Sequence, residues 1–178
     1  HVLECGCKIF ESDFKGLVYC GSWNPLHYGH LEVADHAEQS TGLPLIFELS
    51  VRNCSKEDVS EESVYTRIIQ FTDIDRGIVV NFTPNFVEKA TLFLGCTFVL
   101  GVDTITRVGD LNNYFGHEPT MRRTFELIAE KGCGFLVYPR DGVSLDDVDI
   151  PQELRDLCIS PTNFMEIDIS STKLRENK

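Results

Sequence analysis

The sequence predicts an α/β fold: a doubly wound parallel sheet with helices on both faces, an α/β/α sandwich in a single domain. Short apolar runs alternate with segments of helical pattern along the whole chain, and repeated strand-helix-strand units imply right-handed crossovers. The runs are near-continuous in Val, Ile, Leu and Phe, which is typical of parallel strands covered on both faces. A chain of 178 residues is long enough to bury one core, and it shows no internal repeat.

Six apolar runs are the expected strands. In open α/β sheets, ligands bind beyond the carboxyl ends of the strands, at the point where the strand order reverses. Residues with reactive or charged groups that follow a run are therefore the first candidates for a site. The six runs are Leu17–Cys20, Leu45–Leu49, Ile78–Phe82, Thr97–Leu100, Phe135–Tyr138 and Phe164–Ile169.

The expected helices lie between these runs. Val64 and Ile68 belong to an apolar stripe at helical spacing. Thr83-Pro84 forms a cap-then-N1 pair, which predicts the start of another helix. The four helical segments are Leu31–Gln39, Ser60–Phe71, Asn85–Leu92 and Glu118–Lys131.

Two segments fall outside this alternation of strands and helices. The acidic stretch Arg140–Pro151 is expected to be a solvated surface loop, with a weak alternative as a magnesium site. Residues 1–16 are expected to be a linker or an N-terminal extension. The folded domain is then expected to cover residues 17–178.

The composition restricts the expected partners. The chain has 28 acidic and 16 basic residues, which gives a formal net charge of -12 at pH 7. Such a surface repels a phosphate backbone, so neither nucleic acid nor an anionic membrane is an expected partner. No apolar run approaches the roughly 20 residues that span a bilayer. A small anionic substrate must instead meet a local positive site, and the sequence leaves open whether the chain forms a homo-oligomer.

The seven cysteines form no recognisable disulfide framework. Free thiols in a reducing cytoplasm or organelle matrix are the expected state, and secretion is not expected. Cys5-x-Cys7 has a metal-binding spacing, but no second Cys/His pair lies nearby at zinc spacing. Cys20 and Cys54 are poor candidate nucleophiles because neither has a His partner nearby in the sequence. We therefore expect no metal held by the protein and no covalent intermediate.

The strongest functional signal is the stretch from Gly21 to His30, which joins the first expected strand to the first expected helix. His27 and His30 are three residues apart at a helix start, so they point the same way. Free backbone N–H groups and the helix dipole already favour an anion there. Two unrelated surface imidazoles, or half of a zinc site, are the alternatives. Because glycines let the backbone approach a ligand closely, we predict a polyphosphate site.

This stretch resembles the Gly-Ser-Phe-Asn-Pro-x-His-x-Gly-His signature of the nucleotidyltransferase superfamily, with Trp23 in place of the usual Phe. The resemblance implies a Rossmann-like sandwich and catalytic roles for His27 and His30. It also implies that the nucleotide is bound by Gly21, Ser22, Trp23, Asn24 and Gly29.

A second motif, Ile169-Ser170-Ser171-Thr172-Lys173-Leu174-Arg175, combines a strand end, hydroxyl groups at a helix start and a cation one turn on. Hydroxyl and backbone N–H groups suit phosphate oxygens, and Arg175 offers a bidentate donor. An ordinary Ser/Thr helix cap is the alternative. The motif resembles the Ile-Ser-Ser-Thr-x-Ile/Leu-Arg motif of nicotinamide and nicotinate mononucleotide adenylyltransferases. That resemblance implies that Arg175 is catalytic and that phosphates are held by Ser170, Ser171 and Thr172.

Two weaker motifs agree with this family. Gly101-Val102-Asp103 resembles its Gly-x-Asp segment, in which Asp103 would bond ribose or base edges, and a plain helix cap is the alternative. Arg140 lies in a segment that resembles the family's Arg-x-Gly, and it either touches the nucleotide or is solvated. By contrast, residues 47–53 depart from the family's usual acceptor-binding pattern.

Together these motifs imply an enzyme that transfers AMP from ATP to a phosphorylated acceptor, nicotinamide or nicotinate mononucleotide, and releases pyrophosphate. Mg²⁺ would accompany ATP, held mainly by the substrate phosphates. Three alternatives stay open: CTP as the donor, a different phosphorylated acceptor, and a sensing module that binds a nucleotide without turnover. If catalysis needs one charged imidazole, the rate should fall as the pH rises past its pKa.

Overall fold

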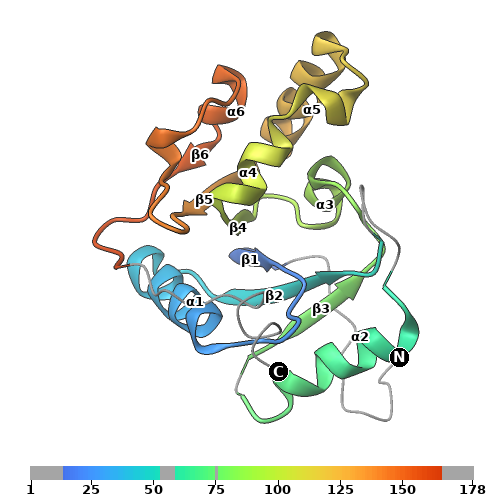
Figure 1. Cartoon of the computed structure of the whole chain (residues 1–178), viewed down its shortest axis with the longest axis vertical. Helices are drawn as coiled ribbons and strands as arrows, with labels where there is room; N and C mark the ends of the chain where they lie inside the picture. The colour runs from blue at the N-terminus through green and yellow to red at the C-terminus, as the bar shows by residue number, and fades with distance from the viewer. Residues whose placement is uncertain (1–13, 53–58, 75, 166–178) are drawn as a thin grey trace.

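The computed structural model describes residues 14–52, 59–74 and 76–165. In this part of the chain, six strands form a parallel sheet in the order β3-β2-β1-β4-β5-β6 (Figure 1). The strand order reverses between β1 and β4, which pair at the centre of the sheet, so the ligand site is expected there. The strands are β1 (Leu17–Cys20), β2 (Leu45–Ser50), β3 (Ile78–Asn81), β4 (Thr97–Gly101), β5 (Gly134–Tyr138) and β6 (Cys158–Ile159).

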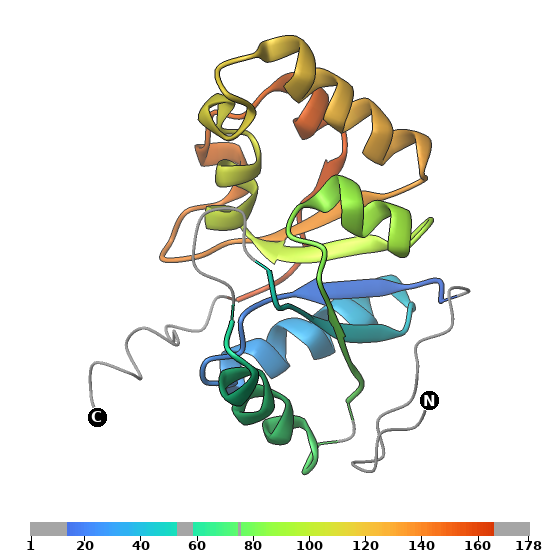
Figure 2. The same cartoon turned by 90° about the vertical axis from the view of Figure 1, so that its right-hand side faces the viewer.

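Helices cover both faces of this sheet, as Figure 2 shows. One face carries α1 (Tyr28–Thr41) and α2 (Glu61–Ile68), and the remaining helices lie on the opposite face. These are α3 (Phe86–Leu92), α4 (Val102–Val108), α5 (Glu118–Glu130) and α6 (Gln152–Arg155). The described residues also form the 3₁₀ turns η1 (Ile69–Phe71), η2 (Leu111–Tyr114) and η3 (Leu145–Asp147). The fold is the expected Rossmann-like α/β sandwich in one domain.

The face covered by α1 and α2 is closely packed. Ala34 and Ala37 of α1 are fully buried in one cluster with Leu17 of β1 and Phe47 of β2. Short alanine side chains let the helix lie close to the sheet, where its position is fixed by dense packing. The amino end of α1 is thereby held at the carboxyl end of β1.

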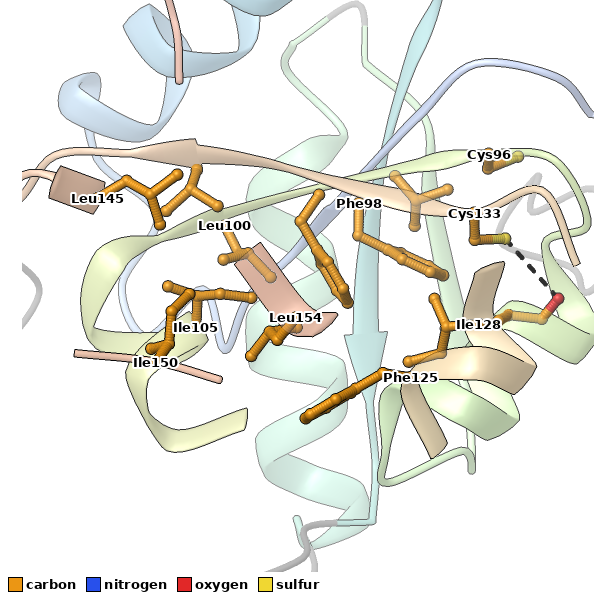
Figure 3. Close-up of a cluster of buried hydrophobic side chains, with 14 of the residues drawn as sticks. Cys96, Phe98, Leu100, Ile105, Phe125, Ile128, Cys133, Leu145, Ile150 and Leu154 are labelled. Atoms are coloured by element: carbon orange, nitrogen blue, oxygen red, sulfur yellow. Dashed lines mark hydrogen bonds between the residues drawn. The ribbon is translucent and has the colours of Figure 1, made fainter. Parts of the chain in front are cut away.

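The opposite face holds a larger apolar cluster, shown in Figure 3. Phe98 of β4 lies there with Phe125 and Ile128 of α5, all fully buried. The thiol of Cys133 donates a hydrogen bond to the backbone oxygen of Phe93 at 3.2 Å. This buried cysteine behaves as a small apolar residue with one weak donor, as free cysteines in cores usually do.

The sixth strand is not where the sequence predicts it. The strand expected at Phe164–Ile169 is wrong in its first two residues, because Phe164 and Met165 have no strand structure, and residues 166–169 lie outside the described part. The observed sixth strand is β6, where Cys158 pairs with Phe135. Phe164 instead packs edge-on against the ring of Tyr138, with centroids 4.7 Å apart, so its apolar side chain is partly buried without a strand.

The start of α3 also differs from the prediction. Asn85, rather than Thr83, is the N-cap, and its side-chain oxygen accepts the backbone N–H of Glu88 at 3.0 Å. Thr83 is bound elsewhere, because its backbone N–H and its hydroxyl both donate to Oδ1 of Asn81. The predicted end of the helix at Leu92 is confirmed.

The acidic stretch after β5 is not simply a solvated loop. Leu145 and Ile150 within it are buried in the core, although most of the Asp residues of this stretch are exposed. The guanidinium group of Arg155 donates to the backbone oxygens of Leu145 and Val148, which fixes the stretch to α6. The expectation of a surface excursion over Arg140–Pro151 is therefore wrong at Leu145 and Ile150, whereas Val143 is exposed.

The described N-terminal residues contact the domain. Phe14 packs against the larger cluster, and its backbone oxygen accepts the thiol of Cys96 at 3.3 Å. The backbone oxygen of Gly16 accepts the N–H of Thr97 at 3.0 Å. Within the described residues, none of the helices has the length and apolar character needed to cross a membrane.

Candidate functional site

The site begins at the turn that follows β1. The backbone N–H of Gly21 donates to the backbone oxygen of Glu48 on β2 at 3.1 Å, and the indole N–H of Trp23 donates to the same oxygen at 3.0 Å. A Cβ atom added to Gly21 would lie 2.5 Å from the indole ring of Trp23. Glycine is therefore required here, because the turn folds directly onto the Trp23 ring.

Trp23 anchors this turn in the core. Its side chain is 1% exposed, and its ring makes edge-on contacts with Tyr19, His30 and Phe47 at centroid distances of 4.9, 5.0 and 4.9 Å. Edge-to-face pairs of this kind contribute beyond their buried area. Trp23 thus acts mainly by packing, and through its ring it fixes the position of His30.

The two predicted histidines lie together at the start of α1. His27 is the N-cap, and its backbone N–H donates to Nδ1 of His30 at 3.3 Å. The two imidazole rings stack with centroids 3.6 Å apart and an interplanar angle of 21°. Among the described residues, the buried Nδ1 of His27 has no hydrogen-bond partner. Because Nδ1 of His30 accepts a hydrogen bond, the proton of the neutral ring is assigned to Nε2.

Burial makes both imidazoles hard to charge. Burial, together with the smaller effects of the charges of His27 and Arg140, lowers the pKa of His30 to about 3. Burial and Arg140 also lower the pKa of His27 from its ordinary value. Both rings are therefore neutral at pH 7 and act as hydrogen-bond donors or acceptors, unless a bound anion stabilises the charged form.

A cleft of about 1000 Å³ opens beside the two histidines at the carboxyl ends of the strands. Its described lining includes five basic side chains and three carboxylates, in addition to His27 and His30. The cleft is thus locally positive in a chain of net charge -12, as expected for a small anionic ligand. The charged lining residues are Arg52, Arg67, Lys89, Arg107, Arg140, Glu48, Asp103 and Asp110.

The lining near β4 and β5, here called the β4 side, holds the predicted Asp103 and Arg140. The Asp103 carboxylate lies 3.6 Å from Nη1 of Arg140 and 3.6 Å from Nη2 of Arg107. All three side chains are partly exposed to solvent, so these ion pairs are weak and can exchange for contacts with a ligand. The members of the β4 side are Gly101, Asp103, Thr104, Arg107, Asn113 and Arg140.

The opposite lining, here called the β3 side, contains a buried ion pair. The ammonium group of Lys89 on α3 bonds Oε1 of Glu48, and Nδ2 of Asn81 donates to the same oxygen at 2.8 Å. Lys89 is 4% exposed and Glu48 is 1% exposed. The members of the β3 side are Ser50, Arg52, Pro84, Asn85, Phe86 and Lys89.

Cys20 lies beside this ion pair, at the end of β1. Burial raises the pKa of its thiol well above the ordinary value, and the negative charge of Glu48 raises it further. A protonated, buried thiol is a poor nucleophile. Cys20 therefore stays a poor candidate nucleophile.

Most of the predicted nucleotide-binding residues lie together. The cleft lining contains Gly21, Ser22, Trp23, His27, Gly29, His30, Gly101, Asp103 and Arg140. Asn24 belongs to the same turn but is not part of the lining. Ser170, Ser171, Thr172 and Arg175 lie outside the described residues, so their roles stay predictions.

The residues of the β3 side are the main addition to the sequence-based site. Glu48 carries one signal that predicts it, because it is a charged residue within the apolar run Leu45–Leu49. Lys89 carries none, since a lysine on a predicted helix is normally a solvated one. Arg67 reaches the site from α2, where its Nη1 donates to the backbone oxygen of Ser22 at 3.0 Å.

The described residues contain no group of three or more His, Cys, Asp and Glu side chains placed to hold a metal ion. Of the carboxylates in the cleft lining, Glu48 is bound to Lys89, and Asp103 faces two arginines. These two carboxylates therefore face cationic groups of the protein itself.

The fold and the cleft together define an α/β protein with a locally positive cleft at the switch point of its parallel sheet. Residues 18–177 match the model of the Cytidylyltransferase-like family, and the chain belongs to that family. No sequence among the curated proteins matches the chain.

Among solved structures, the chain is similar to the nicotinic acid mononucleotide adenylyltransferase of Plasmodium falciparum in complex with NaAD. The TM-score is 0.57 at 17% sequence identity, and the match covers 92% of this chain and 83% of the other. At this identity, the likeness supports the shared fold.

Proposed function

We propose that this protein transfers a nucleotidyl group, AMP from ATP, to the phosphate of a mononucleotide acceptor and releases pyrophosphate. The acceptor that the motifs favour is nicotinate or nicotinamide mononucleotide. The observation that carries the proposal is the stacked pair His27 and His30 at the amino end of α1, which lines a locally positive cleft. Helix amino ends and neutral imidazole N–H groups both suit phosphate oxygens.

The two sides of the cleft fit two substrates. The β4 side offers Asp103 and Arg140, whose polar groups suit a ribose and a base, and the motif resemblance puts the nucleoside of ATP there. The β3 side then takes the acceptor, with Arg52 as the cation near its phosphate, and Arg67 lies beside the turn at Ser22. The triphosphate lies between the sides, over the turn from Gly21 to His30.

The chemistry needs no general base, because the acceptor phosphate is already an anion. Its oxygen attacks the α-phosphorus of ATP as the bond to the leaving pyrophosphate breaks, so catalysis consists of alignment and charge stabilisation. The Nε2–H group of His30 donates to a phosphate oxygen, and His27 beside it contributes a second ring nitrogen. Mg²⁺, when bound to the triphosphate, neutralises part of its charge.

Pyrophosphate release tests this proposal directly. The purified chain is given Mg²⁺ with ATP or CTP and one acceptor at a time: nicotinate mononucleotide, nicotinamide mononucleotide, phosphopantetheine, flavin mononucleotide or a polyol phosphate. Release with ATP and a pyridine mononucleotide is the expected result. Release with another pair would keep the transfer chemistry and correct the substrates. ATP binding without release for any acceptor would contradict the enzyme and favour a nucleotide sensor.

A further inference from the structure

Glu48, which lines the cleft, accepts hydrogen bonds through both its backbone oxygen and its carboxylate. Its backbone oxygen accepts the N–H of Gly21 and the indole N–H of Trp23, at 3.1 and 3.0 Å. Both donors belong to the turn that leads to the stacked histidines. The position of that turn is therefore tied to the backbone of β2.

The carboxylate of the same residue holds the β3 side. Oε1 of Glu48 accepts from Lys89 on α3 and from Nδ2 of Asn81 at the end of β3. Oδ1 of Asn81 in turn accepts the backbone N–H and the hydroxyl of Thr83, at 3.0 and 2.6 Å. The hydroxyl of Ser50 donates to the backbone oxygen of Thr83 at 2.9 Å. One continuous set of hydrogen bonds thus runs from the turn after β1 to the loop before α3.

Stability alone does not account for this arrangement. Burying a charged pair costs desolvation free energy that its attraction recovers only in part, and apolar residues of similar size are often as stable. The surroundings of Glu48 along β2 are apolar, so an apolar residue would fit the strand pattern. The ion pair instead supplies fixed geometry at the point where the two sides of the cleft meet.

We infer that Glu48 is a positioning residue that couples triphosphate binding at the turn to the acceptor-binding β3 side, with Trp23 and Lys89 as its two partners. The assignment of the acceptor to the β3 side rests on the proposed function. The Trp23 indole is essential to the coupling, because the Phe of the family signature has no N–H group to donate to the Glu48 oxygen. The chain thus adds a hydrogen bond at the residue where it departs from the signature.

Hydrogen exchange with a non-reacting nucleotide isolates this coupling from turnover. The probe is α,β-methylene-ATP with Mg²⁺, without any acceptor. In the unaltered protein, we expect slower exchange both at residues 21–30 and, by at least threefold, at residues 81–89. In Glu48→Gln, Lys89→Met and Trp23→Phe, we expect protection at residues 21–30 to remain and protection at residues 81–89 to be lost.

A matched control separates coupling from lost stability. Leu154 is fully buried on α6 and does not line the cleft, so Leu154→Ala lowers stability without touching the chain of hydrogen bonds. We expect Leu154→Ala to keep protection in both regions. If Glu48→Gln is protected at residues 21–30 and 81–89 as the unaltered protein is, the inference is overturned. Protection of the unaltered protein at residues 21–30 alone would also overturn it.

Steady-state kinetics give a second readout. Their substrate is the acceptor that the pyrophosphate-release assay identifies. We expect Glu48→Gln and Lys89→Met to lower kcat at least tenfold and to raise the KM of the acceptor, with the KM of ATP changed less than threefold. Lys89→Arg keeps the charge and should recover part of the loss. The double variant Glu48→Gln/Lys89→Met removes both charges, and full recovery of activity in it would show that only charge balance matters.

The failure of this inference is distinguishable from the failure of the proposed function. If the unaltered protein binds the nucleotide and releases pyrophosphate, and the variants behave in the same way, only the coupling is overturned. No binding of the nucleotide analogue to the unaltered protein would overturn both.

Discussion

The imidazole rings of His27 and His30 stack at a centroid distance of 3.6 Å, and both are neutral because burial, and after it the charge of Arg140, lowers the pKa of each ring. Two imidazolium ions could not share this position without a counter-charge. A polyphosphate supplies that charge, so the geometry favours an anion as the group that belongs beside the pair. The neutral rings can thus donate hydrogen bonds to a phosphate without first changing their protonation state.

Replacement of His27 should reduce the rate of transfer and leave the fold intact. We expect His27→Ala to lower kcat/KM at least tenfold, about 1.4 kcal/mol of barrier, because a contact to the transition state is lost. Pyrophosphate release measures the rate, with His117→Ser as the control, since His117 is an exposed cap of α5 far along the chain. A rate unchanged by His27→Ala would move the catalytic site elsewhere.

The pKa of His30 gives stability a defined pH dependence. The folded pKa is lowered to about 3, below the ordinary 6.5, so the unfolded chain binds the proton more readily between these values. The contribution is therefore present above pH 6.5 and is lost as the pH falls. Between pH 7 and 5, we expect the stability advantage of the unaltered protein over His30→Gln to shrink by about 2 kcal/mol, measured by urea unfolding at each pH. An advantage that stays constant with pH would contradict the lowered pKa.

The pH dependence of the rate follows from the same neutral state. Since kcat/KM reports the free enzyme, and both imidazoles are neutral there at pH 7, we expect kcat/KM for ATP to stay flat from pH 7 to 9. This differs from the hypothesis of a required imidazolium, which predicts a tenfold loss per pH unit above its pKa. If kcat/KM falls over this range, and the fall is absent in His27→Ala, the hypothesis of a required imidazolium would be supported instead.

The first five strands and the histidine turn were predictable because local pattern decides them. The predicted run Leu17–Cys20 matches β1 at both ends, because four apolar residues, three of them buried, precede a glycine. Gly21 and the His27–His30 spacing then fix which residues meet at the end of that strand. The nucleotide motifs are contiguous in sequence, so their geometry is set over a few residues.

The β3 side was not predictable, because it depends on contacts between distant segments. Glu48 and Lys89 are 41 residues apart, and their bond exists only when α3 packs over β2. The start of α4 was missed for a different reason: Gly101 ends β4 and caps α4 at once, so no loop residues mark the change. Leu145 and Ile150 were missed because two apolar residues in an acidic stretch carry no periodic signal.

The close contact of Gly21 with Trp23 predicts a specific pair of compensating substitutions. A Cβ on Gly21 would lie 2.5 Å from Cη2 and Cζ2 of the indole, atoms that a phenylalanine ring does not have at that reach. We therefore expect Gly21→Ala to destabilise the protein by about 1–3 kcal/mol through overpacking, and Gly21→Ala/Trp23→Phe to be destabilised by less than the sum of the single changes. Gly77→Ala is the control, because its added Cβ would meet only a methyl group of Ile46 at 3.8 Å. Urea unfolding of the four variants measures the interaction, and strict additivity of the free energies of unfolding would show that the turn relaxes away from the indole ring.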